Sequence, residues 1–169
     1  MWFDVEPTDL SFVDAAPFII ENEAVINASP ERVFEVFSTG EGQIEWFRDF
    51  KATRWLSEAP HGVGSTREIE LKTLTVKERF VAWEPGRRLS FTIYAITLPL
   101  VTAMLEDLHF EPMGPDRTRL RWRVNYRPSV AMRLVHPVAR SIFGEMFSAS
   151  TAGIARYATD RPVSAGPLP

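Results

Sequence analysis

The sequence has no cysteine in its 169 residues. This absence excludes disulfides, thiolate nucleophiles and zinc sites built on cysteine. The three histidines, His61, His109 and His136, do not show the spacing of a metal site. The glycines of Gly62–Gly64 are not followed by the lysine of a phosphate-binding loop. We therefore expect neither a metal nor another cofactor.

A strong charge and a long apolar run are also missing. The formal net charge of −3 is too small to indicate a nucleic-acid partner. The longest apolar stretch, Tyr94–Leu105, is short and contains Pro99, so we expect no membrane-spanning segment. Residues 1–10 carry acids and no basic run, which does not match a signal peptide. The expected location is the cytoplasm.

What is present is the composition of an ordinary globular protein, with 45% hydrophobic and 24% charged residues. This length suits one domain with its own core. We expect an N-terminal extension over residues 1–16, a folded domain over residues 17–159 and a flexible tail over residues 160–169.

The hydrophobic pattern predicts strands between two helical regions. Phe18–Asn27 is a first strand, and Ser29 and Pro30 are a good N-cap and first residue for a short helix. A second short helix is expected around Ile44–Phe47. The strands expected after it are Ala52–Leu56, Val63–Leu71, Thr73–Trp83, Arg87–Ile96, Ala103–Glu111 and Thr118–Tyr126. Turn residues between these segments favour an antiparallel meander.

The last of these strands has the clearest alternation. Leu120, Trp122 and Val124 share one face, whereas arginines occupy the other. Acids such as Asp107 and Glu111, on the preceding strand, are expected to pair with these arginines. A solvated, ion-paired surface is therefore preferred over an anion-binding site.

A long helix is expected from about Ser129 to Thr159. Its apolar stripe is expected to face the core and consists of Val135, Val138, Ile142, Met146 and Phe147. Pro137 should kink this helix or divide it into two segments.

Five local sequences stand out in this order of elements, and they are Ile26–Phe34, Gly62–Thr66, Trp83–Phe91, Phe110–Pro112 and Asp116–Leu120. Together with the order of the elements, they resemble the START-like (SRPBCC) superfamily, the polyketide cyclase/dehydrase and lipid-transport group. The resemblance implies an α+β helix-grip fold. In this fold a curved antiparallel sheet of about seven strands wraps around a long C-terminal helix, with two short helices after the first strand.

Alternation along the strands and the helical spacing then predict which side chains line an internal cavity. The predicted lining is apolar and aromatic, as in small-molecule pockets. It comprises Trp46, Phe47, Arg67, Glu78, Phe91, Ile93, Met104, Glu106, Leu108, Phe110, Trp122, Val124, Phe143, Met146 and Phe147. The same side chains would also suit a solid core, so both possibilities stay open.

Three polar residues, Glu106, Glu78 and Arg67, fall on the inward register of their strands. A carboxyl group in an apolar pocket has a raised pKa and is suited to general acid–base catalysis. An internal Arg–Glu pair, or a bulge that turns one acid outward, is the preferred alternative.

Three functions remain possible. The leading hypothesis is a protein that binds, and possibly transports, a lipid-like or polycyclic hydrophobic small molecule. The second is a cyclase or dehydratase with Glu106 or Glu78 as its general acid or base. The third is a protein-interaction module with a filled interior and an exposed apolar patch.

Overall fold

The computed structural model describes residues 1–133 and 135–160. Of the tail expected over residues 160–169, all but the first residue lie outside the described residues. The strands are β1 (Phe3–Asp4), β2 (Phe18–Ile26), β3 (Phe50–Trp55), β4 (Thr66–Leu71), β5 (Thr75–Glu84), β6 (Arg88–Ile96), β7 (Val101–Pro112) and β8 (Thr118–Pro128). The helices are α1 (Phe12–Ala15), α2 (Pro30–Thr39), α3 (Gln43–Trp46), α4 (Val130–Arg133) and α5 (His136–Asp160).

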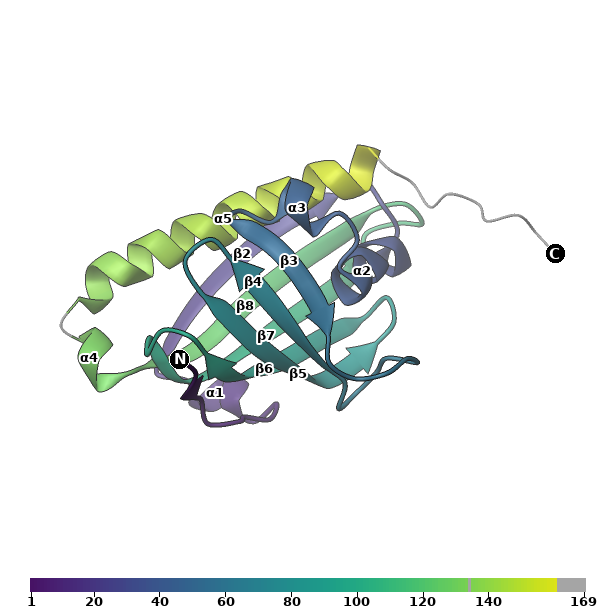
Figure 1. Cartoon of the computed structure of the whole chain (residues 1–169). Coiled ribbons are helices and arrows are strands. Elements are labelled where there is room, and N and C mark those ends of the chain that lie inside the picture. Colours follow the sequence, from purple (N-terminus) through teal and green to yellow (C-terminus); the bar gives the residue numbers. More distant parts are fainter. Residues whose placement is uncertain (134, 161–169) are drawn as a thin grey trace.

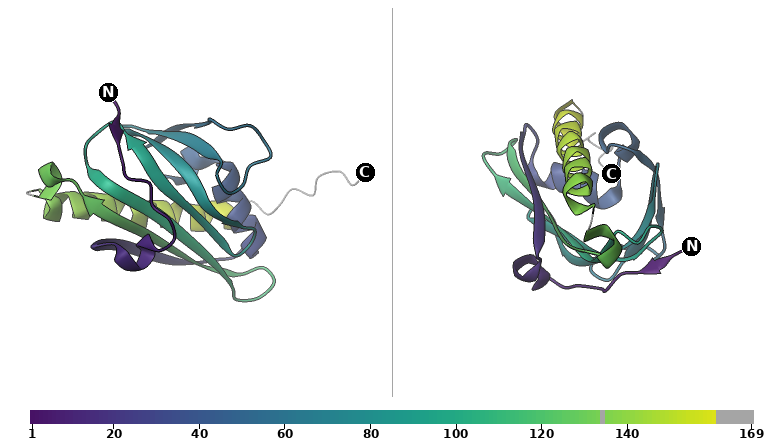
Figure 2. Two further views of the ribbon diagram at one scale, coloured as in Figure 1. Left: turned by 90° about the horizontal axis from the view of Figure 1, so that it is seen from below. Right: turned by 90° about the vertical axis from the view of Figure 1, so that its left-hand side faces the viewer.

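The strands form one antiparallel sheet in the order β2-β8-β7-β6-β5-β4-β3, and β1 pairs with β6. The sheet curves into a deep cup, and α5 lies along its open side (Figure 1). Figure 2 shows the cup end on, with the sheet wrapped around the helix. The chain therefore has the expected α+β helix-grip fold.

The register between β7 and β8 determines which side chains face into the cup. Glu106 is paired with Val124, and Leu108 is paired with Trp122. The register shift in this pair of strands lies between Val101 and Ala103, so it leaves the inward row intact. On the outer face, Arg119 and Arg121 of β8 form the expected ion pairs with Glu111, and Arg123 pairs with Glu21 of β2. Asp107, which was also expected to pair with these arginines, pairs with Arg88 of β6.

Local sequence explains how α2 closes one end of the cup. The Ser29 hydroxyl accepts a hydrogen bond from the Arg32 amide at 3.2 Å, and Pro30 occupies the first turn. Gly40 ends the helix with a φ of 77°, which favours glycine. The helix buries Val33, Phe34, Val36 and Phe37 against the sheet.

The long helix expected from Ser129 to Thr159 is divided into α4 and α5. Pro137 is the second residue of α5, where its missing amide hydrogen costs little. The expected burial of Val135, Val138 and Ile142 is wrong, because these side chains are 53%, 66% and 63% exposed. The opposite side of the first turns of α5 is also apolar. Helical periodicity cannot distinguish two apolar sides, so the prediction placed the exposed side against the core.

The N-terminal segment first joins the sheet through β1 and then packs α1 on its outer face. Val5 is 2% exposed and belongs to the main core, whereas Phe12 from α1 forms a separate small cluster with Ala103 and Leu105. The side chain of Arg127 lies over the Phe12 ring at 5.5 Å. The helix α1 thus covers apolar positions on the side of the sheet that faces away from α5.

Candidate functional site

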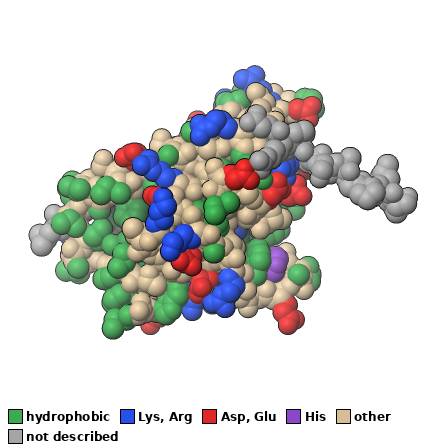
Figure 3. All heavy atoms as spheres, turned by 45° about the horizontal axis from the view of Figure 1, so that its top comes forward, with side chains coloured by type: hydrophobic (Ala, Val, Ile, Leu, Met, Phe, Trp, Pro, Cys, Tyr) green, Lys and Arg blue, Asp and Glu red, His purple; other side chains and the backbone are tan. Residues whose placement is uncertain are grey.

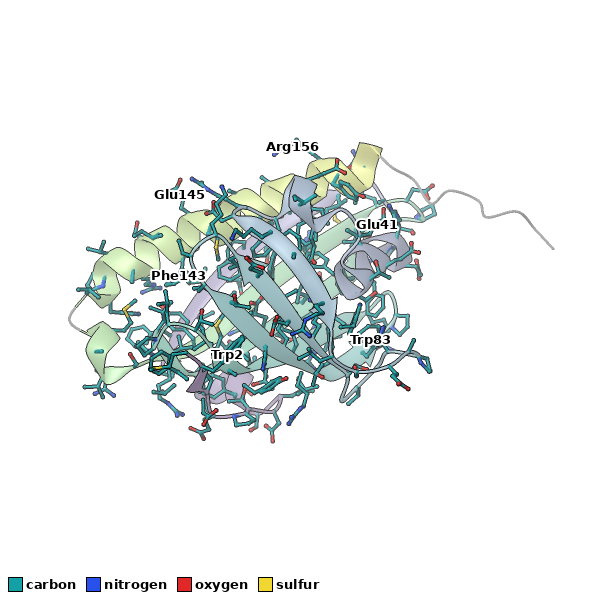
Figure 4. All side chains as sticks on the ribbon, in the orientation of Figure 1. Trp2, Glu41, Trp83, Phe143, Glu145 and Arg156 are labelled. Carbon is teal, nitrogen blue, oxygen red and sulfur yellow. The ribbon has the colours of Figure 1, made fainter. Side chains whose placement is uncertain are left out.

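A cavity of about 100 Å³ lies between the inner face of the sheet and α5. All the predicted lining residues contribute to it except Leu108 and Phe110. Phe143 points from α5 toward the sheet, whereas Glu145 and Arg156 point away from it (Figure 4). The interior is therefore not completely filled.

Leu108 and Phe110 face inward but do not line the cavity, contrary to the prediction. At this end of the cup α2 covers the sheet, and the rings of Phe34 and Phe37 lie 5.8 and 6.0 Å from that of Phe110. These rings form a solid core, so the cavity occupies only the other part of the cup.

Several lining residues at the opposite end of the cavity were not predicted. They are Tyr126, Met132, His136, Ala139 and Arg140. Continuing the alternation of Trp122 and Val124 along β8 would have indicated Tyr126. The others depend on how the chain turns between α4 and α5, for which the sequence has no clear signal.

Arg67 and Glu78 form a buried ion pair on the cavity wall. The two residues are direct neighbours across β4 and β5, and Arg67 Nε donates to Glu78 Oε2 at 2.6 Å. Arg67 Nη1 also donates to the backbone oxygen of Phe37 at 3.1 Å, and the guanidinium lies 4.9 Å from the centre of the Phe80 ring. Burial raises the pKa of the Glu78 carboxyl, and the charge and hydrogen bond of Arg67 oppose that rise.

Glu106 lies beside this pair but is bound differently. Its Oε2 accepts a hydrogen bond from Trp122 Nε1 at 2.8 Å, and the residue is 6% exposed. Burial raises the pKa of Glu106 to about 8, and the nearby Glu78 charge adds to that rise. The Trp122 hydrogen bond and the more distant Arg67 charge oppose it. At neutral pH Glu106 is therefore mostly protonated and can donate a hydrogen bond into an apolar cavity.

The start of α5 is fastened to the edge of the sheet where the cavity ends. His136 Nε2 and the Tyr126 hydroxyl are 2.9 Å apart, and the Phe18 ring lies 4.2 Å from the His136 ring. Arg140 Nη2 donates to the backbone oxygen of Ile19 at 3.3 Å. These contacts are few and partly exposed, so they hold this end of the helix less firmly than the buried contacts at its other end.

On the outer face, Asp107 and His109 are joined by a serine that the sequence did not indicate. His109 Nε2 is 3.0 Å from Asp107 Oδ2, while the Ser90 hydroxyl donates to Asp107 Oδ1. Burial raises the pKa of Asp107, but hydrogen bonds from His109, Arg88 and Ser90 outweigh burial and hold the pKa below its usual range. Because the hydroxyl is bound to the carboxylate and not to the imidazole, this is not a nucleophile–base arrangement.

Across residues 1–133 and 135–160, no cluster of three or more His, Asp or Glu side chains could hold a metal ion. In the same part of the chain, no helix has the length and apolar character needed to cross a bilayer.

Comparison with known proteins identifies the family. The model of the family described as polyketide cyclase/dehydrase and lipid transport matches residues 17–159, and the chain belongs to this family. Among curated proteins, an uncharacterized protein of Mycobacterium tuberculosis is 29% identical over 142 residues, which cover 83% of this chain and 81% of that protein. An uncharacterized protein of Mycobacterium bovis matches to the same extent.

Solved structures show the same fold. The Zhui aromatase/cyclase from Streptomyces sp. R1128 superimposes with a TM-score of 0.74 at 16% identity, covering 88% of this chain and 96% of that one. A START superfamily protein from Mycobacterium smegmatis gives a TM-score of 0.65 at 14% identity, covering 82% of this chain and 98% of that one. The chain is thus similar to both an enzyme and a START protein.

Proposed function

We propose that this protein binds a hydrophobic small molecule, lipid-like or polycyclic, in the cavity beneath α5. The observation that carries the proposal is an apolar and aromatic cavity with a buried carboxyl group, Glu106, that is hydrogen-bonded to Trp122 on its wall. Burial of the ligand would supply most of the affinity, at roughly 25 cal/mol per Å² of apolar surface. Glu106 would orient the ligand by donating a hydrogen bond to an acceptor such as a carbonyl oxygen.

The size of the cavity bears on how a ligand would enter. Its volume of about 100 Å³ is smaller than the roughly 300–1,000 Å³ of common ligand pockets. Binding a polycyclic molecule therefore requires side chains to move. Met104, Met132 and Met146 line the cavity, and their unbranched side chains change shape at little cost.

The direct test is native mass spectrometry of the purified protein, combined with organic extraction and a panel of fatty acids, sterols and polycyclic ketones. We expect a co-purifying or added apolar ligand, and we expect Phe147→Trp, which fills the cavity, to lower its occupancy. Ile44→Trp is the matched control, because Ile44 is 69% exposed. If no member of the panel binds, the proposal fails.

A second candidate function, an enzyme of the cyclase or dehydratase type, is favoured by the protonation of Glu106. A carboxylic acid with a pKa of about 8 can give its proton to a leaving hydroxyl or to a carbonyl oxygen near neutral pH. The similarity in fold to an aromatase/cyclase is consistent with this chemistry. Glu106→Gln should then abolish turnover and leave ligand binding in place, whereas a passive carrier would show no turnover to lose.

Because the sequence lacks cysteine, it suits a reducing compartment, and we propose the cytoplasm as the site of action. A protein-interaction module with a filled interior is less favoured, since the interior contains a cavity.

A further inference from the structure

Four large apolar side chains are exposed together where α4 leads into α5. Val130, Val135, Val138 and Ile142 are 73%, 53%, 66% and 63% exposed, and we call them the α4–α5 patch. Val135, Val138 and Ile142 have the three- and four-residue spacing of one helix side. Figure 3 shows hydrophobic side chains gathered over this end of the molecule.

The charged residues within the segment that carries the patch are all arginines, of which Arg127 pairs with Glu6 from the N-terminal segment. From Arg127 to Gly144 the sequence contains three arginines and no aspartate or glutamate. Arg133 and Arg140 are exposed within the same segment as the patch. Exposed apolar residues flanked by arginines, with no acid among them, are typical of helices that lie in the interface of an anionic membrane.

The patch is continuous with the end of the cavity. Met132, His136 and Phe143 line the cavity, and they alternate along the same segment with the residues of the patch. Figure 1 shows α4 beyond the end of the sheet, next to the start of α5, and the end view in Figure 2 shows it in front of the open end of the cup. A surface that contacts the patch would therefore also meet the segment that lines this end of the cavity.

We propose that the α4–α5 patch docks on the surface of an anionic lipid bilayer, so that the end of the cavity lined by Met132 and His136 faces the membrane. This inference goes beyond the proposed function. The side chains of the patch would enter the interface between headgroups and acyl chains, and the arginines would lie among the phosphates. A second copy of the chain suits the patch less well, because a two-fold contact sets a patch against itself and would bring the arginines together.

Vesicle flotation without any added ligand tests the proposal. The probes are vesicles of equal parts phosphatidylcholine and phosphatidylglycerol, compared with vesicles of phosphatidylcholine alone. We expect the full chain to float with the anionic vesicles and to lose this association at high salt. The double substitution Val138→Ser/Ile142→Ser should weaken binding at least tenfold. Arg133→Gln should weaken binding by roughly fivefold.

Matched controls stand at the other end of the molecule. Ile44→Ser and Arg156→Gln change equally exposed residues and should leave vesicle binding unchanged. Circular dichroism shows whether each variant is folded. The proposal is overturned if the wild type binds neither kind of vesicle, or if patch and control variants bind alike. It is also overturned if the patch substitutions abolish only a concentration-dependent dimer. Because no ligand is present, these results do not depend on whether the cavity binds one.

Discussion

Among single residues, Glu106 has an environment that makes the stability of the fold depend on pH. It is a carboxylic acid surrounded by aromatic rings, and its pKa is about 8 against 4.5 for an unperturbed glutamate. Between these two pH values the folded chain keeps a proton that the unfolded chain has released. Glu106 therefore contributes a fall in the free energy of unfolding as pH rises from about 4.5 to about 8.

We expect Glu106→Gln to remove most of this pH dependence. The stability of the wild type should fall by a few kcal/mol relative to the variant across this interval, since each pKa unit corresponds to about 1.4 kcal/mol. Urea denaturation at several pH values measures the difference. Glu111→Gln, which changes a half-exposed and ion-paired glutamate, is the control and should follow the wild type. If the free energy of unfolding changed with pH in the same way for the wild type and Glu106→Gln, the raised pKa of Glu106 would be contradicted.

The buried Arg67–Glu78 ion pair gives a second prediction for single residues. Both side chains are at most 6% exposed, so Arg67→Met leaves a buried carboxyl group without its partner. We expect a loss of about 3–5 kcal/mol in the free energy of unfolding, much of it recovered in Arg67→Met/Glu78→Leu. Arg54→Met breaks an exposed pair between β3 and β4 and should cost less than about 1 kcal/mol. Equal losses for Arg67→Met and Arg54→Met would argue against a buried pair.

The inward direction of these three polar side chains and an internal Arg–Glu pair could be predicted from the sequence, whereas the acid that pairs with Arg67 could not. Alternation places Arg67, Glu78 and Glu106 on the inward side because that depends only on local strand geometry. Their pairing depends on the register between β4 and β5 and on the rotamer of Trp122. With two acids and one arginine, either Glu78 or Glu106 could form the ion pair with Arg67. In the structure the partner of Arg67 is Glu78.

At the scale of elements, strands were predicted more accurately than the long helix. Each predicted strand from Phe18 onward overlaps an observed one, because one face of the sheet is buried and the pattern repeats every second residue. The helix was correct in its extent but not in the orientation of its first turns. There both sides are apolar, one facing the cavity and the other exposed, and periodicity cannot distinguish them.

The close contact between α5 and α3 gives a prediction for two glycines of one helix. A Cβ atom added to Gly153 would lie 2.2 Å from the backbone oxygen of Trp46, whereas one added to Gly144 would meet nothing within 4 Å. Gly153→Ala should therefore destabilise the fold by about 1–3 kcal/mol despite the better helix propensity of alanine. Gly144→Ala should stabilise it by up to about 1 kcal/mol. Thermal unfolding of both variants tests this, and a gain from Gly153→Ala would rule out the close packing.

For the whole molecule, the two faces of the sheet serve different purposes. The inner face holds α5 and the cavity, and the outer face is partly covered by α1, which belongs to the N-terminal segment (residues 1–16) outside the part matched by the family model. The resemblance could thus predict the cup and its helix, but it carried no information on this N-terminal segment. We propose that the segment stabilises the sheet without taking part in ligand binding.

The substitution Phe12→Ala tests whether the N-terminal segment stabilises the sheet without taking part in ligand binding. Phe12 is 6% exposed and packs on Ala103 and Leu105, so its truncation should cost about 3 kcal/mol in the free energy of unfolding. Ligand affinity should not change, because the whole sheet lies between Phe12 and the cavity. Phe47→Ala is the counterpart on the inner face, and it should lower both stability and ligand affinity. If Phe12→Ala weakened binding as much as Phe47→Ala, the outer segment would have to be coupled to the cavity through the backbone of β7. The expectation of separate roles follows from the topology, since Ala103 and Leu105 alternate along β7 with Met104 and Glu106, which face the cavity.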